Sequence, residues 1–262
     1  MQIPAGLLLN GFDMFLLVFV RMTGLFVVAP IFGRRNIPTL FKIGFSFFTA
    51  LILVNTTVVK NIQYDNNILG YALLIIKEFM IGLSIGFVAY LAYTAFYIAG
   101  EIIDRQIGFG IVNVLDPISN IQVPVTSNLY FIISMLMFLT INGHHMLILT
   151  LFDSFTTLPL GTALFNKEIV DGITGLFTTV LATGFKIAAP IVASILITDI
   201  ALGTISKMVP QINIFVIGMP LKIIVGMVIL IITIPAFISI METVYKLMNS
   251  SMLDYIKELG PK

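Results

Sequence analysis

The sequence predicts an all-α membrane protein, and composition is the first reason for this prediction. Hydrophobic residues make up 58% of the 262 residues, charged residues make up 10%, and the mean hydropathy is +1.07. Soluble domains are about half apolar and roughly a quarter charged, so this composition is typical of a chain that lies in a bilayer. The apolar residues also form long runs, and the chain has room for roughly six spans of ~20 residues.

Six apolar runs each predict a helix. They cover roughly residues 11–32, 41–59, 68–99, 128–152, 169–206 and 213–249. The first run is followed by Arg34, Arg35 and Lys42, and such a basic cluster favours a cytoplasmic loop. From about residue 236 to 259, apolar residues recur at helical spacing and predict an amphipathic C-terminal helix. With no boundary signal along the chain, we expect a single helical domain over residues 1–262.

Some runs are too long for one straight crossing, because a 32-residue helix measures ~48 Å and the hydrocarbon core is ~30 Å thick. Proline removes a hydrogen bond from a helix interior, and four prolines lie in or beside the runs. These are Pro30, Pro190, Pro220 and Pro235. We therefore expect broken or kinked helices and hairpins that pack against other protein chains.

Ionisable residues inside apolar runs are candidate functional residues, because each costs ~2.5–3.5 kcal/mol at mid-bilayer and normally faces protein or water. Lys77 and Glu78 are adjacent, so they cannot share one helix face, and a structural pair or contacts to a neighbouring chain are favoured over a proton or ion relay. Asp199 could pair with Lys186 or Lys207, or serve as a transport carboxylate. The spacing of Gly82 and Gly86 permits close helix packing.

The segment from Gly100 to Pro117 is the most unusual. Four charged residues give it a net charge of −2, and a short glycine-flanked apolar run follows them. The charged residues are Glu101, Asp104, Arg105 and Asp116. This segment is either an ordinary connection or a mobile apolar plug that occludes a pore.

Several function classes are excluded or disfavoured. The chain has no cysteine, so a disulfide or thiolate metal site is excluded, and the adjacent His144 and His145 lack the i, i+4 spacing of helical metal ligands. The formal charge of +1 gives no reason to expect nucleic acid binding. No nucleophile–base constellation, P-loop or acidic pair with plausible catalytic spacing is present, so we expect no enzyme, no cofactor and no metal.

A set of motifs runs in order from about residue 21 to 226. They are Arg21-x-x-Gly24, Pro30-Ile-Phe-Gly33, Ile37-Pro38, Glu78-x-x-x-Gly82-x-x-x-Gly86, Gly100-Glu101, Gln106-x-Gly108, Asp116-Pro117, Asn142-Gly143-His144, Ser154-Phe155, Pro159-x-Gly161, Ala189-Pro190, Asp199-x-Ala201-x-Gly203, Pro210-Gln211-x-Asn213 and Gly218-x-Pro220-x-Lys222. Together they resemble the FliR family of flagellar type III export-gate proteins, which has counterparts in virulence injectisomes. The motif residues would then serve structure and assembly.

This resemblance implies an architecture and partners. Kinked helical hairpins would assemble with FliP-like and FliQ-like subunits into a helical, hetero-oligomeric gate, with an FlhB-like protein near its cytoplasmic entrance. The gate would lie in the bacterial inner membrane, at the flagellar basal body, in contact with membrane lipid. Unfolded flagellar proteins would pass through it.

The resemblance also implies that a loop plugs the conduit at rest. Its residues would be Gly108, Phe109, Gly110, Ile111, Val112, Asn113 and Val114. Aromatic plug positions of relatives are aliphatic here, as Ile111 and Val114. Two alternatives stay open: an injectisome export-gate homologue, or a free-standing ion-coupled secondary transporter that uses Asp199.

Overall fold

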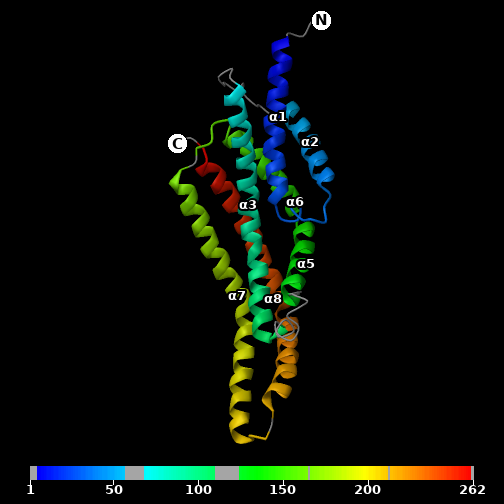
Figure 1. The fold of residues 1–262 in the computed structure, drawn as a ribbon, viewed down its shortest axis with the longest axis vertical. Coiled ribbons are helices and arrows are strands. Elements are labelled where there is room, and N and C mark those ends of the chain that lie inside the picture. Colours follow the sequence, from blue (N-terminus) through cyan, green and yellow to red (C-terminus); the bar gives the residue numbers. More distant parts are fainter. Residues whose placement is uncertain (1–4, 57–67, 110–123, 165, 212, 261–262) are drawn as a thin grey trace. The chain divides into compact units, whose positions relative to one another are not determined.

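A computed structural model describes residues 5–56, 68–109, 124–164, 166–211 and 213–260 (Figure 1). These residues form seven α-helices and no strand, so the predicted all-α class is confirmed. The helices are α1 (Ala5–Val28), α2 (Thr39–Thr56), α3 (Ile68–Ile107), α5 (Val125–Thr140), α6 (Gly143–Thr157), α7 (Lys167–Met208) and α8 (Ile214–Glu258).

Four of the described helices are long and apolar enough to cross a membrane. They are α1 over Gly11–Val28, α3, α7, and α8 over Val216–Glu258, and α5 with α6 would make a fifth span if the two act as one. With 40, 42 and 45 residues, α3, α7 and α8 each measure about 60–70 Å at 1.5 Å per residue. Each is about twice as long as the ~30 Å hydrocarbon core.

Three of the four prolines lie inside helices and do not break them. α7 continues through Pro190, and α8 continues through Pro220 and Pro235. A proline removes one intrahelical hydrogen bond. A helix of more than 40 residues keeps its other backbone hydrogen bonds and therefore continues. Only Pro30 follows a helix end, in the turn after α1. The fourth apolar run does break near Asn142, which has the left-handed φ of 58° that asparagine tolerates.

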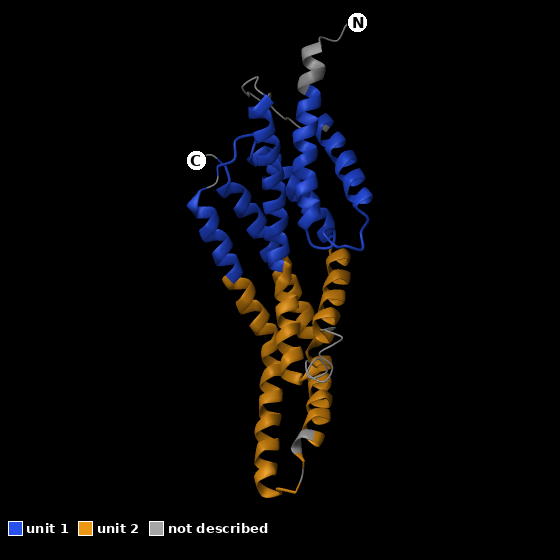
Figure 2. Cartoon of the chain, in the orientation of Figure 1, with its two compact units in different colours: residues 1–92, 142–177, 246–262 blue, residues 93–141, 178–245 orange. Residues whose placement is uncertain are grey.

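The chain divides into two compact units (Figure 2). Unit 1 contains residues 1–92, 142–177 and 246–262, and unit 2 contains residues 93–141 and 178–245. α3, α7 and α8 each contribute residues to both units. The single domain over 1–262 and the amphipathic helix over 236–259 remain predictions, although α8 covers the second range as far as Glu258.

In unit 1, α1 packs on α2 through phenylalanine rings and on α3 through glycines. Phe47 of α2 meets the ring of Phe15 edge to face at 5.2 Å. Between α1 and α3 the backbones touch: a Cβ added to Gly82 would collide with the carbonyl oxygen of Arg21, and one added to Gly86 would lie 2.8 Å from that of Leu25. This is the close helix contact that glycines four residues apart permit.

Unit 2 is organised around aromatic side chains of α3, α5 and α8. The rings of Tyr130 and Phe237 stack at 4.0 Å, and both side chains are buried. The hydroxyls of Tyr93 and Tyr245 both bond to Ser134, the first to its Oγ at 2.6 Å and the second to its carbonyl oxygen. These bonds allow buried tyrosines to satisfy their polar ends.

The α1–α3 contact generates a first prediction. Gly82→Ala should destabilise the protein by about 1–3 kcal/mol, because the added methyl group overpacks a backbone contact. The measurement is unfolding in detergent micelles. The control is Gly44→Ala on α2, where an added Cβ meets nothing within 4 Å and helix propensity favours alanine by about 1 kcal/mol. Equal effects of the two substitutions would contradict the close contact.

Candidate functional site

The central feature of unit 1 is a fully buried ion pair. Arg21 of α1 and Glu78 of α3 both have side chains that are 0% exposed, and Arg21 Nε donates to Glu78 Oε2 at 2.6 Å. A charge buried without a partner would be strongly destabilising, so each of these side chains requires the other. We define the Arg21 cluster as Arg21, Lys77, Glu78, Ser154, Leu158 and Gly161.

The guanidinium also binds the C-terminal end of α6. Its Nη1 donates to the carbonyl oxygens of Ser154 and Leu158 at 3.2 and 3.1 Å, and Cζ lies 4.3 Å from the centre of the Phe155 ring. The last carbonyls of a helix lack intrahelical partners and carry partial negative charge, so a cation is favourable there. Arg21 Nη2 is buried without a hydrogen-bond partner among the described residues.

One glycine completes the cluster. Gly161 has the left-handed φ of 82° that favours glycine, donates its N–H to Glu78 Oε1 at 2.8 Å, and accepts from Lys77 Nζ at 2.8 Å. Lys77 and Glu78 therefore bind the same residue, although neighbouring positions on a helix do not share a face. Because the contacts join helix ends and a turn, they favour the structural interpretation over a proton relay.

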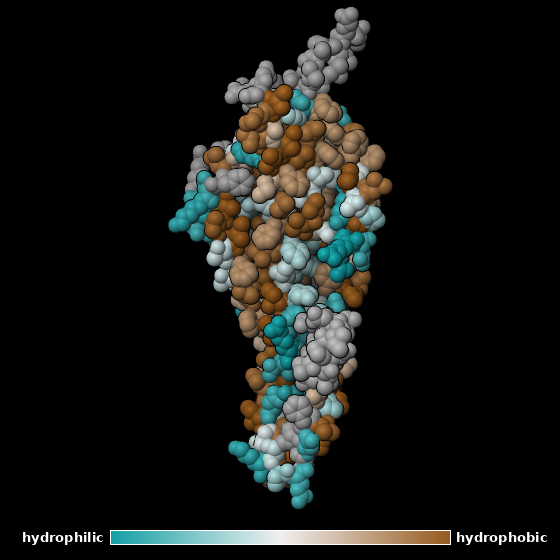
Figure 3. All heavy atoms as spheres, viewed as in Figure 1, coloured by the Kyte–Doolittle hydropathy of each residue, from teal (hydrophilic) through white to brown (hydrophobic). Residues whose placement is uncertain are grey.

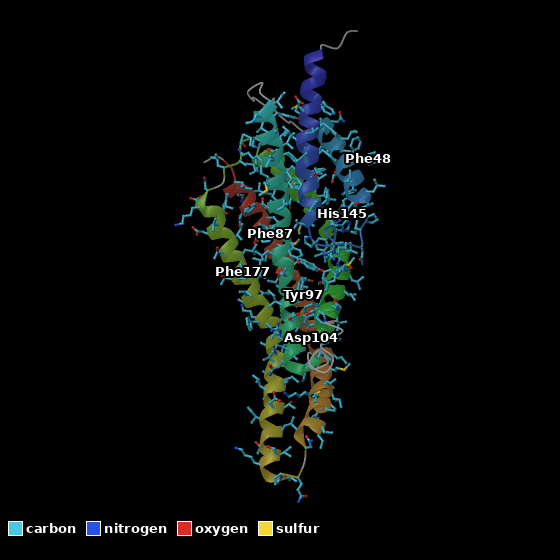
Figure 4. All side chains as sticks on the ribbon, in the orientation of Figure 1. Phe48, Phe87, Tyr97, Asp104, His145 and Phe177 are labelled. Carbon is cyan, nitrogen blue, oxygen red and sulfur yellow. The ribbon has the colours of Figure 1, made fainter. Side chains whose placement is uncertain are left out.

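The central feature of unit 2 is Asp104, near the end of α3 (Figure 4). Its carboxylate accepts the N–H of Thr126 at 2.9 Å and that of Ser127 at 3.4 Å. These are the second and third residues of α5, whose N-cap residue, Pro124, offers no capping side chain. Asp104 therefore caps α5 from another helix, where a negative charge is also favoured by the helix dipole.

Two further contacts join the same helix ends. Gly100 touches the backbone of Ser127 so closely that a Cβ would collide with it, and Ser127 Oγ donates to the carbonyl of Tyr97 at 3.2 Å. We define Tyr97, Gly100, Asp104, Thr126 and Ser127 as the Asp104 clamp. It holds the end of α3 against the start of α5, so the two ends of the intervening segment lie together.

The predicted plug lies between these ends, and only its beginning is described. Gly108 ends α3 with a φ of 99°, and its N–H bonds to the carbonyl of Asp104 at 3.1 Å. Phe109 is half-buried. Gly110, Ile111, Val112, Asn113 and Val114 lie outside the described residues, as do Asp116 and Pro117.

Asp199 has a different partner from those expected. Its carboxylate pairs with Lys222 of α8, within unit 2, and not with Lys186 or Lys207 of its own helix. Asp199 and Lys207 are eight positions apart, which is about two helical turns and too far for contact. The turn between α7 and α8 brings Lys222 back to Asp199. Both side chains remain about one third exposed.

The other predicted residues lie in turns or on helix faces. Pro30, Gly33 and Pro38 belong to the α1–α2 turn, where Gly33 donates to the carbonyl of Ala29 at 2.8 Å. Glu101 forms an exposed pair with Arg105 at 3.1 Å. Asn142 and Gly143 lie at the break between α5 and α6, and Gly203 lies within α7. The α7–α8 turn contains Pro210, Gln211 and Asn213.

A metal centre has no structural support in the described part of the chain. The rings of His144 and His145 lie 4.2 Å apart, but no group of three or more His, Cys, Asp or Glu side chains among the described residues could hold a metal ion. Sequence reasoning missed the roles of Asp104, Ser154 and Gly161, although Asp104 was noted as a charged residue and the other two as motif residues. All three bond through or to backbone groups, which leave no signal in residue identity.

Comparison with known proteins covers most of the chain. Residues 12–248 match the family described as bacterial export proteins, family 1. The chain is 35% identical over 257 residues to the flagellar biosynthetic protein FliR of Bacillus subtilis (strain 168), covering 97% of this chain and 98% of that protein. It is 29% identical over 260 residues to the flagellar biosynthetic protein FliR of Escherichia coli (strain K12), covering 99% and 98%.

The Arg21 cluster yields a prediction about stability. Arg21→Met should destabilise the protein by about 3–5 kcal/mol, because Glu78 stays buried without its cation. The double variant Arg21→Met/Glu78→Met should lose less free energy of unfolding than the two single variants together, because it leaves no unpaired buried charge. Unfolding in detergent micelles measures both.

Arg105→Met is the matched control for Arg21→Met. Arg105 makes an ion pair with Glu101 on the surface, its side chain is 82% exposed, and such pairs contribute about 0–1 kcal/mol. Similar losses for Arg21→Met and Arg105→Met, or strict additivity of the double variant, would contradict the cluster.

The Asp104 clamp yields a prediction about local opening. Asp104→Ala should weaken the start of α5 by about 1–2 kcal/mol, and Asp104→Asn should retain part of the effect because an amide oxygen still accepts hydrogen bonds. Hydrogen exchange should accelerate at the amides of Thr126 and Ser127. Glu101→Gln, one turn earlier on α3, should leave both amides protected, and unchanged exchange in Asp104→Ala would refute the cap.

Proposed function

The chain belongs to the FliR family of bacterial export proteins, and on that premise we propose that it is a core subunit of the flagellar export gate. It is a membrane component of the flagellar export apparatus, and the match over residues 12–248 is the observation that carries this function. The finer proposal is that it lines part of a conduit for unfolded flagellar proteins in the bacterial inner membrane. We propose no enzymatic role for it.

Exposed apolar surface supports an assembly with other chains. Hydrophobic residues cover much of the visible surface of unit 1, and in unit 2 they are interspersed with hydrophilic residues (Figure 3). On α8, Val216, Ile224, Ile231 and Ile232 are each at least 60% exposed. Apolar patches of this extent on a protein normally contact lipid or another chain. We propose FliP-like and FliQ-like subunits and an FlhB-like protein as those chains.

The Asp104 clamp supports a plug formed by the segment that contains residues 108–114. Because the clamp holds the end of α3 against the start of α5, the segment leaves and returns at one place in unit 2. Its apolar residues are flanked by Gly108 and Gly110, which give the backbone freedom to turn. An apolar loop fixed at its base can close a pore by dewetting.

The transporter alternative has weaker support. Asp199 is paired with Lys222, so its charge is compensated within the protein. A coupling carboxylate would have to exchange this cation for a transported ion. Asp199→Asn should therefore leave protein export largely intact under our proposal, whereas it would abolish solute uptake by a transporter.

The plug is tested by deleting residues 109–114 or by replacing Gly108 and Gly110 with isoleucine. Either change should let ions leak through the assembled gate, because the apolar closure is lost or displaced. Ion conductance of cells that carry the gate, together with secretion of flagellar proteins, measures the effect. Gly175→Ile is the control, since an added Cβ there meets nothing within 4 Å and this glycine belongs to none of the motifs.

Co-purification separates the two levels of the proposal. The tagged chain, expressed with its FliP-like and FliQ-like neighbours, should give a discrete complex by native mass spectrometry for the unchanged protein and for the loop deletion. A lone monomer or homodimer of the unchanged protein would refute the gate assignment. An assembled deletion variant that exports normally and leaks no ions would refute only the plug.

A further inference from the structure

Two buried hydroxyls at the start of α5 have no hydrogen-bond partner among the described residues. They are Thr126 Oγ1 and the phenolic oxygen of Tyr130, and both residues are 1% exposed. A hydroxyl that folding removes from water and leaves unpaired costs free energy. In native proteins such groups nearly always bind another protein group or an ordered water molecule.

The two hydroxyls lie on the same face of α5. Thr126 and Tyr130 are four positions apart, so their side chains are neighbours on the helix surface. A long side chain on a helix leans back towards the preceding turn, which carries the hydroxyl of Tyr130 towards Thr126. The ring of Phe237 on α8 stacks against that of Tyr130 at 4.0 Å and holds it there.

The carboxylate of Asp104 is the third polar group at this place. It accepts the N–H of Thr126 at 2.9 Å, and it is close enough to the hydroxyl of Tyr130 to act on it electrostatically. Two backbone N–H groups, from Thr126 and Ser127, use part of its acceptor capacity. A carboxylate has about four lone-pair sites, so Asp104 can accept a further hydrogen bond.

The neighbouring groups of the chain do not complete this set. The hydroxyl of Thr233 on α8 lies near that of Tyr130 but outside hydrogen-bonding geometry, and its own proton goes to the carbonyl of Leu230 at 3.0 Å. A cation is disfavoured beside Asp104, because the positive N-terminal end of α5 adjoins the carboxylate. A small neutral molecule that both donates and accepts hydrogen bonds fits all three groups.

We propose that the Asp104 clamp contains a binding site for one water molecule, formed by Thr126 Oγ1, the hydroxyl of Tyr130 and the carboxylate of Asp104. The water would donate to the carboxylate and bond to both hydroxyls, which gives the three hydrogen bonds that a buried water typically makes. Because Tyr130 stacks on Phe237, the same water would connect the ends of α3 and α5 to α8. This inference uses contacts within unit 2 and does not depend on the gate or its plug.

Removing the hydroxyls tests the site, because Tyr130→Phe and Thr126→Val keep the shapes of the side chains. Each variant takes one partner from the water, so hydrogen exchange at the amides of Ser127 and Asn128 should become roughly tenfold faster in the full-length protein. The double variant T126V/Y130F should exchange little faster than either single variant, because its second substitution removes a partner of a water that is already lost.

The sign of the effect decides between a bound water and an unpaired hydroxyl. Unchanged or slower exchange in the single variants would overturn the proposal, because removing an unpaired buried hydroxyl relieves its cost. Strictly multiplied rates in the double variant would also overturn it, since the two hydroxyls would then have separate partners. Two matched controls should leave the exchange unchanged: Tyr97→Phe, at a tyrosine that is 46% exposed, and Thr140→Val, whose hydroxyl bonds to its own helix.

Electron cryomicroscopy of the assembled protein, at a resolution that shows ordered waters, tests the site directly. Density is expected within hydrogen-bonding distance of Thr126 Oγ1, the hydroxyl of Tyr130 and the carboxylate of Asp104, and it should be lost in T126V/Y130F. A protein group bonded directly to either hydroxyl, from this chain or from another, would overturn the water site.

Discussion

The buried ion pair between Arg21 and Glu78 is the constraint on which unit 1 depends. Removing two charges from water costs several kcal/mol per ion, and mutual attraction offsets that cost only when further hydrogen bonds satisfy the remaining polar atoms. Here those bonds come from the end of α6 and from Gly161, so one buried arginine and one buried glutamate together hold three helices, α1, α3 and α6, and one turn. The glycines that bring α1 against α3 are part of the same requirement, because a wider spacing would separate the charges.

In unit 2 a buried charge also satisfies a helix end, but there the charge is negative and the end is the N-terminus. Arg21 places a cation at the C-terminus of α6, and Asp104 places an anion at the N-terminus of α5. Each charge satisfies backbone groups that a helix end leaves without partners, and each complements the helix dipole. The chain thus stabilises the ends of α5 and α6 with charged side chains that come from other helices. Ion pairs near the surface, such as Glu101 with Arg105, have no comparable role.

The helical class and the close contact at Gly82 and Gly86 could be predicted, because composition and glycine spacing are local properties of the sequence. The need of Glu78 for a partner was equally readable, since an isolated charge is costly in an apolar helix. Its partners could not be predicted: Arg21 lies 57 residues away in sequence, and Gly161 contributes a backbone N–H that all residue types except proline share. Lys222 was missed as the partner of Asp199 because only lysines on the same apolar run, Lys186 and Lys207, were considered. The sequence does not show that α8 returns alongside α7. The prolines do not break α7 or α8, since one lost hydrogen bond does not end a helix of more than 40 residues.

The glycine contact between α1 and α3 also determines how these helices can move. A slip of one or two residues along the pair would put a side chain where Gly82 meets the carbonyl of Arg21, and sterics forbid it. A slip of four residues would bring Gly86 to that carbonyl, but it would carry Arg21 ~6 Å from Glu78 and strand both charges. Steric overlap thus excludes a slip of one or two residues, and the separation of Arg21 from Glu78 excludes a slip of four. The register of α1 on α3 is therefore fixed. Within unit 1 these two helices can act only as one rigid rod, and any sliding motion has to occur elsewhere.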